Sequence, residues 1–334
     1  MTERCDVLVI TTPDDPTTDR LLPHLEDAGM SWRRWDPGRV PTRQQAGFWM
    51  DGDRCQRFTV RGDDTQLDLD RVGVLWYRRP STLHAPTTTP NPEIRNFINT
   101  ETRYFVRGVW STIAAPIVCD PRQGDRASMK PYQLEVARKL GWSVPLTYIG
   151  NDPAAVRELF ERTEGRMIVK GFHIGWTRDT QEEGRYLYTA PVDLSDLEDR
   201  AIQACPSIWQ AYVPKDVELR VTVVGNEVHA AEIHSQQSEA SRHDWRRYDF
   251  DNTPYRPHTL PEEVRRRCVR LVRALGLYYG AIDLILTPNG RHVFLEVNPF
   301  GQWGWIEELC DLPISKAHVR LFRELIDGTF SFND

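Results

Sequence analysis

Two acidic residues near the C-terminal end of the chain are spaced so that their side chains could bind one metal ion. Apolar runs at 281–286 and 292–297 predict a β-hairpin, because Asn289-Gly290 between them is typical of a two-residue turn. Such a turn pairs residues that are equally far from it, so Asp283 is expected directly opposite Glu296.

The same hairpin separates an apolar face from a polar face that carries Asp283, Glu296 and Asn298. Facing carboxylates with β-carbons about 5 Å apart repel each other unless one is protonated or a cation lies between them. Oxygen ligands alone suit Mg²⁺ or Mn²⁺, and a nucleotide phosphate usually completes such a shell. The alternative is an exposed hairpin whose acids point into water. The expected apolar face consists of Ile282, Leu284, Leu286, Val293, Leu295 and Val297.

A lysine at the end of a predicted strand is a candidate for binding that phosphate. Residues 167–170 form a strand-like run ending in Lys170, and Gly171 and Gly175 would let backbone N–H groups approach phosphate oxygens. The GxxxxGK[ST] spacing is absent here and no GxGxxG follows the first strand, which disfavours a P-loop enzyme and a dinucleotide-binding domain. A lysine that is simply solvated is the alternative.

The connection between two later strands offers groups that suit a nucleoside. Backbone amides at Gln210, Tyr212 and Val213 would hydrogen-bond an adenine edge. Glu218 and Arg220 lie two residues apart in a strand and share a face, so they offer an acceptor for ribose hydroxyls beside a cation for phosphate. Taken alone, these two residues favour an ordinary surface ion pair worth less than about 1 kcal/mol.

Five further residues have types suited to substrate binding or proton transfer. Arg78 and Arg79 follow a predicted strand and would form bidentate contacts with acidic groups, although an exposed strand end explains them equally well. Asp244 and Arg246 lie in a long polar segment that we expect to cover the active site. Imidazole can exchange protons near neutral pH, so His234 would assist deprotonation of an attacking hydroxyl, whereas a merely hydrogen-bonded histidine is the commoner case.

Composition restricts the classes of protein to consider. The 334 residues suffice for about two domains, and 40% hydrophobic residues allow a packed core. A net charge of −6 gives no general attraction to nucleic acid, and no apolar run is long enough to span a membrane, so we expect a cytoplasmic protein. The histidines lack metal-ligand spacing, which argues against zinc.

The elements that must position these residues alternate between helix and strand. A strand at 7–11, a helix at 17–28 and a strand at 31–35 predict a βαβ opening. Later segments predict a mixture of strands and helices around a domain boundary near residue 120. The strands are expected at 72–77, 146–149, 186–189, 208–212, 218–224 and 228–233, and the helices at 93–114, 131–140, 193–204 and 262–275.

Taken together, these segments resemble the ATP-grasp superfamily over most of the chain. The motifs Trp76-Tyr77-Arg78-Arg79-Pro80, Asp244-Trp245-Arg246-Arg247-Tyr248-Asp249 and 294–303 resemble, more narrowly, the microviridin-type peptide maturases, also called graspetide synthetases. Phe300 stands where that family has Asn. The resemblance implies an α/β (α+β) chain with an N-terminal pre-ATP-grasp domain (1–120), a central lid-like α+β subdomain (121–207) and a C-terminal antiparallel-sheet subdomain (208–334).

The resemblance also implies roles for the residues named above. Lys130 and Lys170 would be the two nucleotide lysines, residues 210–213 the adenine-binding hinge and Glu218 the ribose-binding acid. The Mg²⁺ ligands would be Asp283, Glu296 and Asn298. Phosphoryl transfer mostly needs positioned cations, here Mg²⁺ with Lys170 and Arg220, and no protein nucleophile.

The activity that the resemblance implies is ATP-dependent ring closure in a ribosomally made precursor peptide, recognised through its leader. Phosphorylation of an Asp or Glu side chain of the core peptide would precede attack by a Ser or Thr hydroxyl or a Lys amine, giving an ester or amide. A homodimer is implied by the family alone. Two alternatives stay open, an amino-acid or small-peptide ligase and a non-catalytic ATP-binding protein.

Overall fold

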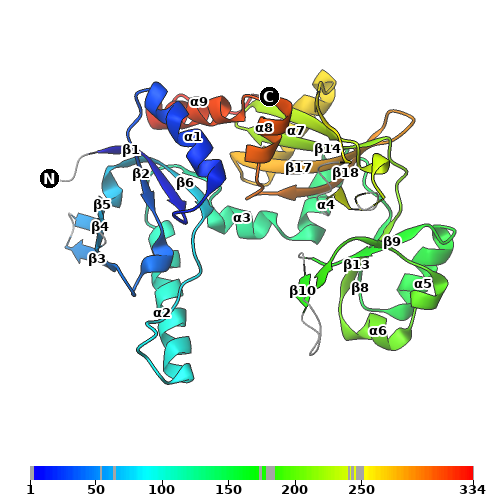
Figure 1. Cartoon of the computed structure of the whole chain (residues 1–334), viewed down its shortest axis with the longest axis horizontal. Coiled ribbons are helices and arrows are strands. Elements are labelled where there is room, and N and C mark those ends of the chain that lie inside the picture. The colour runs from blue at the N-terminus through cyan, green and yellow to red at the C-terminus, as the bar shows by residue number, and fades with distance from the viewer. Residues whose placement is uncertain are drawn as a thin grey trace.

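The computed structural model of the chain is a mixed α/β protein in three parts (Figure 1). A parallel sheet lies in the N-terminal part, a small antiparallel sheet in the central part and a larger antiparallel sheet in the C-terminal part. Within the described residues, every helix is too short or too polar to cross a membrane. The described residues are 4–52, 55–62, 65–172, 175–177, 185–239, 241, 244–245 and 252–333.

The N-terminal sheet confirms the predicted βαβ opening. It contains β1 (Cys5–Thr11), β2 (Trp32–Trp35), β6 (Val72–Arg79) and β7 (Ile117–Val118), in the order β2-β1-β6-β7. Helix α1 (Pro16–Asp27) begins where the Asp15 side chain accepts a hydrogen bond from Thr17 N. Helix α2 (Pro92–Trp110) is shorter than predicted. A separate sheet contains β3 (Gln45–Asp51), β4 (Cys55–Gly62) and β5 (Thr65–Asp68).

The central sheet has the order β12-β9-β13-β8, and strand β13 belongs to it. The predicted C-terminal subdomain starts at residue 208, whereas β13 pairs with the central sheet up to Ala211. The predicted helix at 193–204 is wrong in its first half, because Asp193 and Asp196 cap a separate short turn. The elements are β8 (Thr147–Gly150), α5 (Pro153–Arg162), β9 (Met167–Lys170), β10 (Gly175–Thr177), β11 (Arg185–Leu187), β12 (Ala190–Pro191), α6 (Asp199–Ala204) and β13 (Ser207–Ala211).

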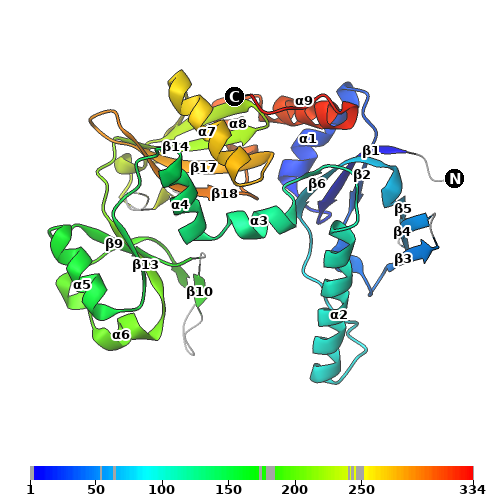
Figure 2. The same cartoon turned by 180° about the vertical axis from the view of Figure 1, so that it is seen from behind.

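The C-terminal sheet is antiparallel, in the order β16-β15-β14-β17-β18. Its strands are β14 (Val217–Val224), β15 (Glu227–Ile233), β16 (Tyr255–His258), β17 (Tyr279–Leu286) and β18 (His292–Asn298). The helices around it are α3 (Pro121–Ala127), α4 (Lys130–Lys139), α7 (Glu262–Ala274), α8 (Gly304–Cys310) and α9 (Ile314–Asp327). Residues of α4 and α7 share a buried core with one face of the sheet. The predicted central subdomain starts at residue 121 and so includes α3 and α4, but these helices cross from the N-terminal domain to the C-terminal sheet (Figure 2).

The hairpin β17-β18 pairs Asp283 with Glu296, as the sequence predicts, although the turn is longer than predicted. Leu286 pairs with His292, so residues 287–291 connect the strands, and a register shift follows Asp283. The shift leaves Leu295 as an extra residue, which moves from the expected apolar face to the opposite one. Phe294 takes its place in the core, where it is fully buried.

One hydrophobic core joins the N-terminal domain to the other face of the C-terminal sheet. Trp76 of β6 lies 6.4 Å from Trp303, measured between ring centroids, and Trp303 lies 4.8 Å from His318 of α9. All three side chains are buried. Because close-packed interiors resist displacement, this shared core holds the ends of β1 and β6 beside the loop that follows β18.

Candidate active site

A pocket between the central sheet and the C-terminal sheet contains most of the predicted nucleotide residues. Its empty volume is about 630 Å³, part of it open to solvent, and small-molecule pockets usually span about 300–1,000 Å³. Ile168, Ile285 and Leu295 contribute apolar wall on both sides. The predicted site residues that line the pocket are Lys170, Gln210, Tyr212, Val213, Glu218, Asp244, Asp283 and Glu296.

The end of β13 carries a buried side-chain oxygen to which no described residue donates a hydrogen bond. The Gln210 side chain is buried, and its Nε2 donates to Thr147 Oγ1 at 2.9 Å. In the part of the chain that the structure describes, Gln210 Oε1 has no hydrogen-bond partner. A buried acceptor without a donor costs free energy, so a ligand that donates to Gln210 would be favoured here.

Glu218 lies in the same pocket beside a lysine that the sequence analysis did not select. Lys215 Nζ lies 2.8 Å from Glu218 Oε1, and both side chains are buried. Burial raises the pKa of Glu218, although Lys215 opposes that shift. The sequence offers one indication of this ion pair, which is the spacing of three residues between Lys215 and Glu218.

The two facing carboxylates of the hairpin are each paired with a cationic side chain. Arg220 Nη1 donates to Asp283 Oδ1 at 2.8 Å, and Lys130 Nζ lies 2.7 Å from Glu296 Oε2. Burial lowers the pKa of Arg220, but Asp283 outweighs that effect and raises it. The repulsion expected between the carboxylates is therefore relieved by protein cations. Both carboxylates still line the pocket that Lys170 lines.

This donor set fits Mg²⁺ held together with a nucleotide. In the described ranges, no three His, Cys, Asp or Glu side chains are grouped to hold a metal by themselves. Asp283 and Glu296 supply two carboxylates, and phosphate oxygens of a nucleotide in the same pocket would supply the rest of an oxygen shell.

Comparison with known proteins identifies the family. No protein-family model and no curated protein matches the chain. Among solved structures, the macrocyclase MdnC of Microcystis aeruginosa MRC, bound with its precursor peptide MdnA, has 30% sequence identity and a TM-score of 0.83. The similarity covers 96% of this chain and 99% of MdnC. The chain belongs to the graspetide-type ATP-grasp maturases. It is a ligase with the ATP-grasp fold.

Two further solved structures support the assignment of the chain to this family. Macrocyclase MdnB from the same organism is 30% identical in sequence and has a TM-score of 0.77. The similarity covers 95% of this chain and 98% of MdnB. A RiPP-associated ATP-grasp ligase of Chryseobacterium gregarium, in complex with ADP and a leader and core peptide, is 25% identical. Its TM-score is 0.88, and the match covers 95% of this maturase and 96% of that ligase.

Asn298, the third predicted metal ligand of this maturase, lies at the end of β18 outside the pocket wall. It pairs with Ala281 across the hairpin and is exposed. Its Oδ1 accepts a hydrogen bond from Phe300 N at 3.0 Å. The side chain is therefore held by the loop after β18, two residues beyond Glu296 on the same face.

The predicted general base His234 lies on the wrong face of the maturase sheet for that role. His234 Nε2 lies 2.9 Å from Glu232 Oε2, and the other oxygen of Glu232 lies 2.7 Å from His258 Nδ1. Glu232 pairs with Leu219, which packs against α7, whereas Arg220 faces away from α7 toward Asp283. His234 is not among the described residues that line the pocket, so the structure does not bring it together with Lys170 and the hairpin carboxylates.

Of the two substrate-binding residues predicted in the polar segment, the structure describes Asp244 but not Arg246. Asp244 is buried in the pocket wall, where its Oδ2 accepts a hydrogen bond from Thr189 N at 3.0 Å. This bond ties the segment to the central sheet of the maturase. Arg246 lies outside the described residues.

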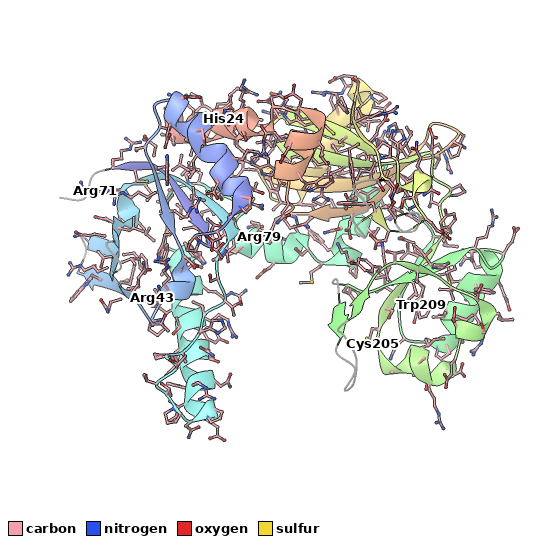
Figure 3. All side chains as sticks on the ribbon, viewed as in Figure 1. His24, Arg43, Arg71, Arg79, Cys205 and Trp209 are labelled. Atoms are coloured by element: carbon pink, nitrogen blue, oxygen red, sulfur yellow. The ribbon has the colours of Figure 1, made fainter. Side chains whose placement is uncertain are left out.

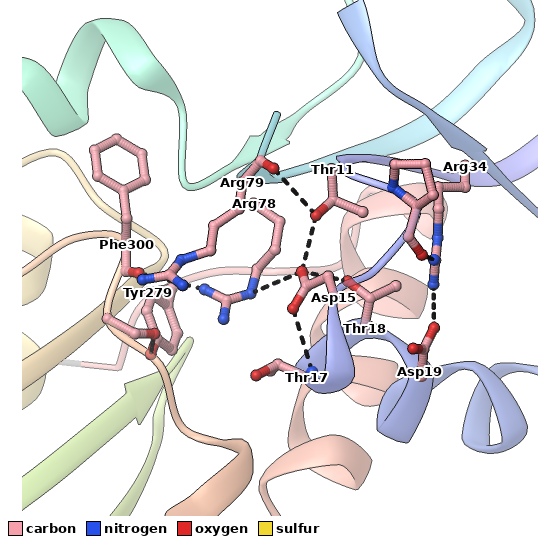
Figure 4. Close-up of polar contacts among 12 residues, drawn as sticks. Thr11, Asp15, Thr17, Thr18, Asp19, Arg34, Arg78, Arg79, Tyr279 and Phe300 are labelled. Atoms are coloured by element: carbon pink, nitrogen blue, oxygen red, sulfur yellow. Dashed lines mark hydrogen bonds and ion pairs between the residues drawn. The ribbon is translucent and has the colours of Figure 1, made fainter. Parts of the chain in front are cut away.

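The double-arginine motif of the maturase divides into a buried and an exposed residue. Arg78 is buried, although both interpretations from the sequence required it to be accessible. Its Nη1 donates to the Phe300 carbonyl at 3.3 Å, and its Nε lies 3.7 Å from Asp15 Oδ2 (Figure 4). Arg78 therefore links the start of α1 to the loop after β18. Arg79 is exposed at the end of β6 (Figure 3).

Replacing Asp15 with Asn should reduce stability in a pH-dependent way. Burial would raise the pKa of Asp15, but Arg78 and the hydroxyls of Thr18 and Thr11 outweigh it and hold the pKa below 3.8. The folded state therefore binds the Asp15 proton more weakly than the unfolded state does. The stabilisation by the Asp15 carboxylate is present at pH values above the unfolded-state pKa of Asp15, and it is lost as the pH falls through the folded-state pKa. Urea unfolding should show Asp15→Asn about 2 kcal/mol less stable near neutral pH. A deficit that persists undiminished in acid would contradict this origin.

Proposed function

We propose that this maturase is an ATP-dependent ligase that activates Asp or Glu side chains of a ribosomal precursor peptide and closes side-chain ester or amide rings. The observation that carries the proposal is the shared pocket. Lys170 from the central sheet and Asp283 and Glu296 from the C-terminal sheet line one cavity, although 126 residues separate Lys170 from Glu296. One cation beside two carboxylates can position the phosphates of a metal-bound nucleotide for phosphoryl transfer.

The pocket walls suggest how ATP would lie. An adenine would occupy the apolar part beside Ile168 and Leu295, with the connector at Tyr212 and the open acceptor of Gln210 at its polar edge. Glu218 would accept hydrogen bonds from the ribose hydroxyls. The phosphates would then extend past Lys170 toward the carboxylates of the hairpin.

Asp283 and Glu296 would hold Mg²⁺, with Asn298 as the next oxygen ligand along β18. The metal would neutralise charge on the transferring phosphoryl group. Lys130 lies 2.7 Å from Glu296 Oε2, so a metal that binds this oxygen would displace Lys130. Mn²⁺ accepts the same ligands and is a second metal to test.

The chemistry proceeds in two balanced steps. A carboxylate oxygen of the peptide attacks the γ-phosphorus of ATP, so that an acyl phosphate forms and ADP leaves. A Ser or Thr hydroxyl or a Lys amine then attacks the acyl carbon, and the C–O bond to phosphate breaks as the ester or amide forms. The departing phosphate takes up the proton that the attacking group loses. Each ring consumes one ATP and removes the elements of one water from the peptide. Lys170 and Arg220 contribute positive charge that orients these anionic groups.

Incubation with ATP, Mg²⁺ and the peptide encoded beside this chain's gene tests the proposal. Mass spectrometry should show the peptide losing one water for each ring closed, in step with ADP release. Ligation of a free amino acid without any change in the peptide would instead identify a small-peptide ligase. Sedimentation of the same sample tests the homodimer implied by the family resemblance.

Arg79→Ala should block peptide modification while leaving ATP affinity unchanged. Arg79 is exposed at the end of β6, where a guanidinium can form bidentate bonds with peptide carboxylates. Ring closure should fall at least about tenfold, because a charge-assisted hydrogen bond contributes about 1.5–3 kcal/mol. ATP titration and mass spectrometry measure the two effects separately. Unchanged modification would remove Arg79 from the peptide-binding surface.

A further inference from the structure

A second hollow lies outside the nucleotide pocket, where the C-terminal half of α2 meets α3 and the loop at residues 80–83. We call it the α2–α3 groove; its empty volume is about 970 Å³, including space open to solvent. Tyr77 and Trp110 form an aromatic part of its wall, with ring centroids 5.8 Å apart. Nothing in the proposed ATP chemistry uses this groove.

Arginines dominate the polar part of the α2–α3 groove. Arg103, Arg107 and Arg122 line it, and Asp125 is the acidic residue among them. This local excess of positive charge contrasts with the net charge of −6 of the whole chain. A concave surface lined by one sign of charge concentrates ligands of the opposite sign.

The three arginines differ in how far their charge is already compensated. Arg107 Nη2 lies 2.7 Å from Asp125 Oδ2, and Arg122 Nη2 lies 2.5 Å from Asp120 Oδ2. Arg103 is exposed and, within the described ranges, makes no ion pair or hydrogen bond. Its guanidinium therefore stands at the groove with all its donors available to a ligand.

Direct packing connects this groove to the loop that follows the predicted metal ligands. The Tyr77 ring lies 6.0 Å from the Phe300 ring, measured between centroids. Helix α3 contacts the same ring, because a β-carbon at Gly124 would lie 2.1 Å from Phe300 Cζ. A peptide held in the groove would thus lie beside the protein segment that follows Asn298.

We propose that the α2–α3 groove binds an acidic segment of the substrate peptide, with Arg103 receiving a carboxylate and Tyr77 and Trp110 packing against the chain. The inference rests on the proposed function for the identity of the peptide. Guanidinium groups bind carboxylates in bidentate geometry, and the aromatic wall provides apolar contact for the aliphatic part of the same side chains. An acidic segment held here would anchor the peptide while another of its carboxylates reaches the nucleotide pocket.

Binding of a defined probe tests this proposal without requiring turnover. The probe is a fluorescein-labelled peptide of alternating Thr and Glu, and its counterpart has Gln in place of each Glu. Arg103→Glu should weaken binding of the Thr-Glu peptide at least about tenfold by fluorescence anisotropy, because it places like charges together. The Thr-Gln peptide should bind weakly to both proteins.

The matched control is Arg270→Glu, which makes the same charge change at an exposed position of α7. It should leave the affinity for the Thr-Glu peptide unchanged, and both variants should keep the wild-type affinity for ATP. Equal loss in both variants, wild-type affinity in Arg103→Glu, or equally tight binding of the Thr-Gln peptide would each overturn the proposal. Because the assay needs no catalysis, its result stands whether or not the wild-type protein closes rings.

Discussion

Glu296→Gln and Asp283→Asn are each expected to reduce ATP turnover about a thousandfold, which corresponds to about 4 kcal/mol of lost transition-state stabilisation. Each change replaces a charged oxygen ligand by a neutral amide in the pocket that Lys170 lines. The amide has nearly the same shape as the carboxylate, so at Glu296, whose partner Lys130 is partly exposed, the loss reports on charge and metal binding. Asp283→Asn also removes the carboxylate that neutralises the buried Arg220, so its turnover is compared at equal folded fraction. ADP release in the presence of Mg²⁺ and peptide measures it.

The loss of turnover in Glu296→Gln is expected to be specific to the pocket, because Glu296 contacts Lys130 and lines the pocket. The matched control is Glu135→Gln on the same helix as Lys130, where the carboxylate forms ion pairs with Arg138 and Lys139. This control should retain wild-type turnover. Normal turnover in Glu296→Gln or in Asp283→Asn would refute the metal assignment.

Arg220→Ala is expected to destabilise the folded protein by about 3–5 kcal/mol, because it leaves the Asp283 carboxylate buried without its cation. Arg220 and Asp283 are direct neighbours across β14 and β17, and both side chains are almost fully buried. Urea unfolding of the two proteins at neutral pH measures the difference. Turnover should also fall, since the same pair adjoins the predicted metal site.

Two further variants isolate the charge effect at Arg220. Arg220→Met combined with Asp283→Leu removes both charges and should recover much of the lost stability, because no unpaired ion remains inside. Arg270→Ala, at an exposed position of α7, should change the free energy of unfolding by less than about 0.5 kcal/mol. A single Arg220→Ala variant as stable as the wild type would show that Asp283 finds another partner.

The hairpin shows where local pattern suffices and where it does not. The pairing of Asp283 with Glu296 followed from two apolar runs around a turn, since strand register is set over short distances. The register shift that moves Leu295 into the pocket could not be foreseen, because alternation alone cannot show where a bulge restores pairing. One extra residue thus moves Leu295 from a core position to the pocket wall.

The two adjacent arginines at the end of β6 show a second limit of prediction from the sequence. The sequence places Arg78 and Arg79 next to each other, and nothing local distinguishes them. The structure buries Arg78 between Asp15 and the Phe300 carbonyl and leaves Arg79 exposed. That difference arises because the loop after β18 packs against the end of β6, more than 200 residues away in the chain.

By itself, the amino-acid sequence determined the βαβ opening, the acidic hairpin, the lysine-ended strand β9 and the family resemblance, because each is encoded by residues close together in the chain. Only the tertiary structure decided which cation neutralises each carboxylate, which arginine is buried and that α3 and α4 pack on the C-terminal sheet. These outcomes depend on contacts between distant segments, and such contacts leave no periodic or spacing signal within any one of them.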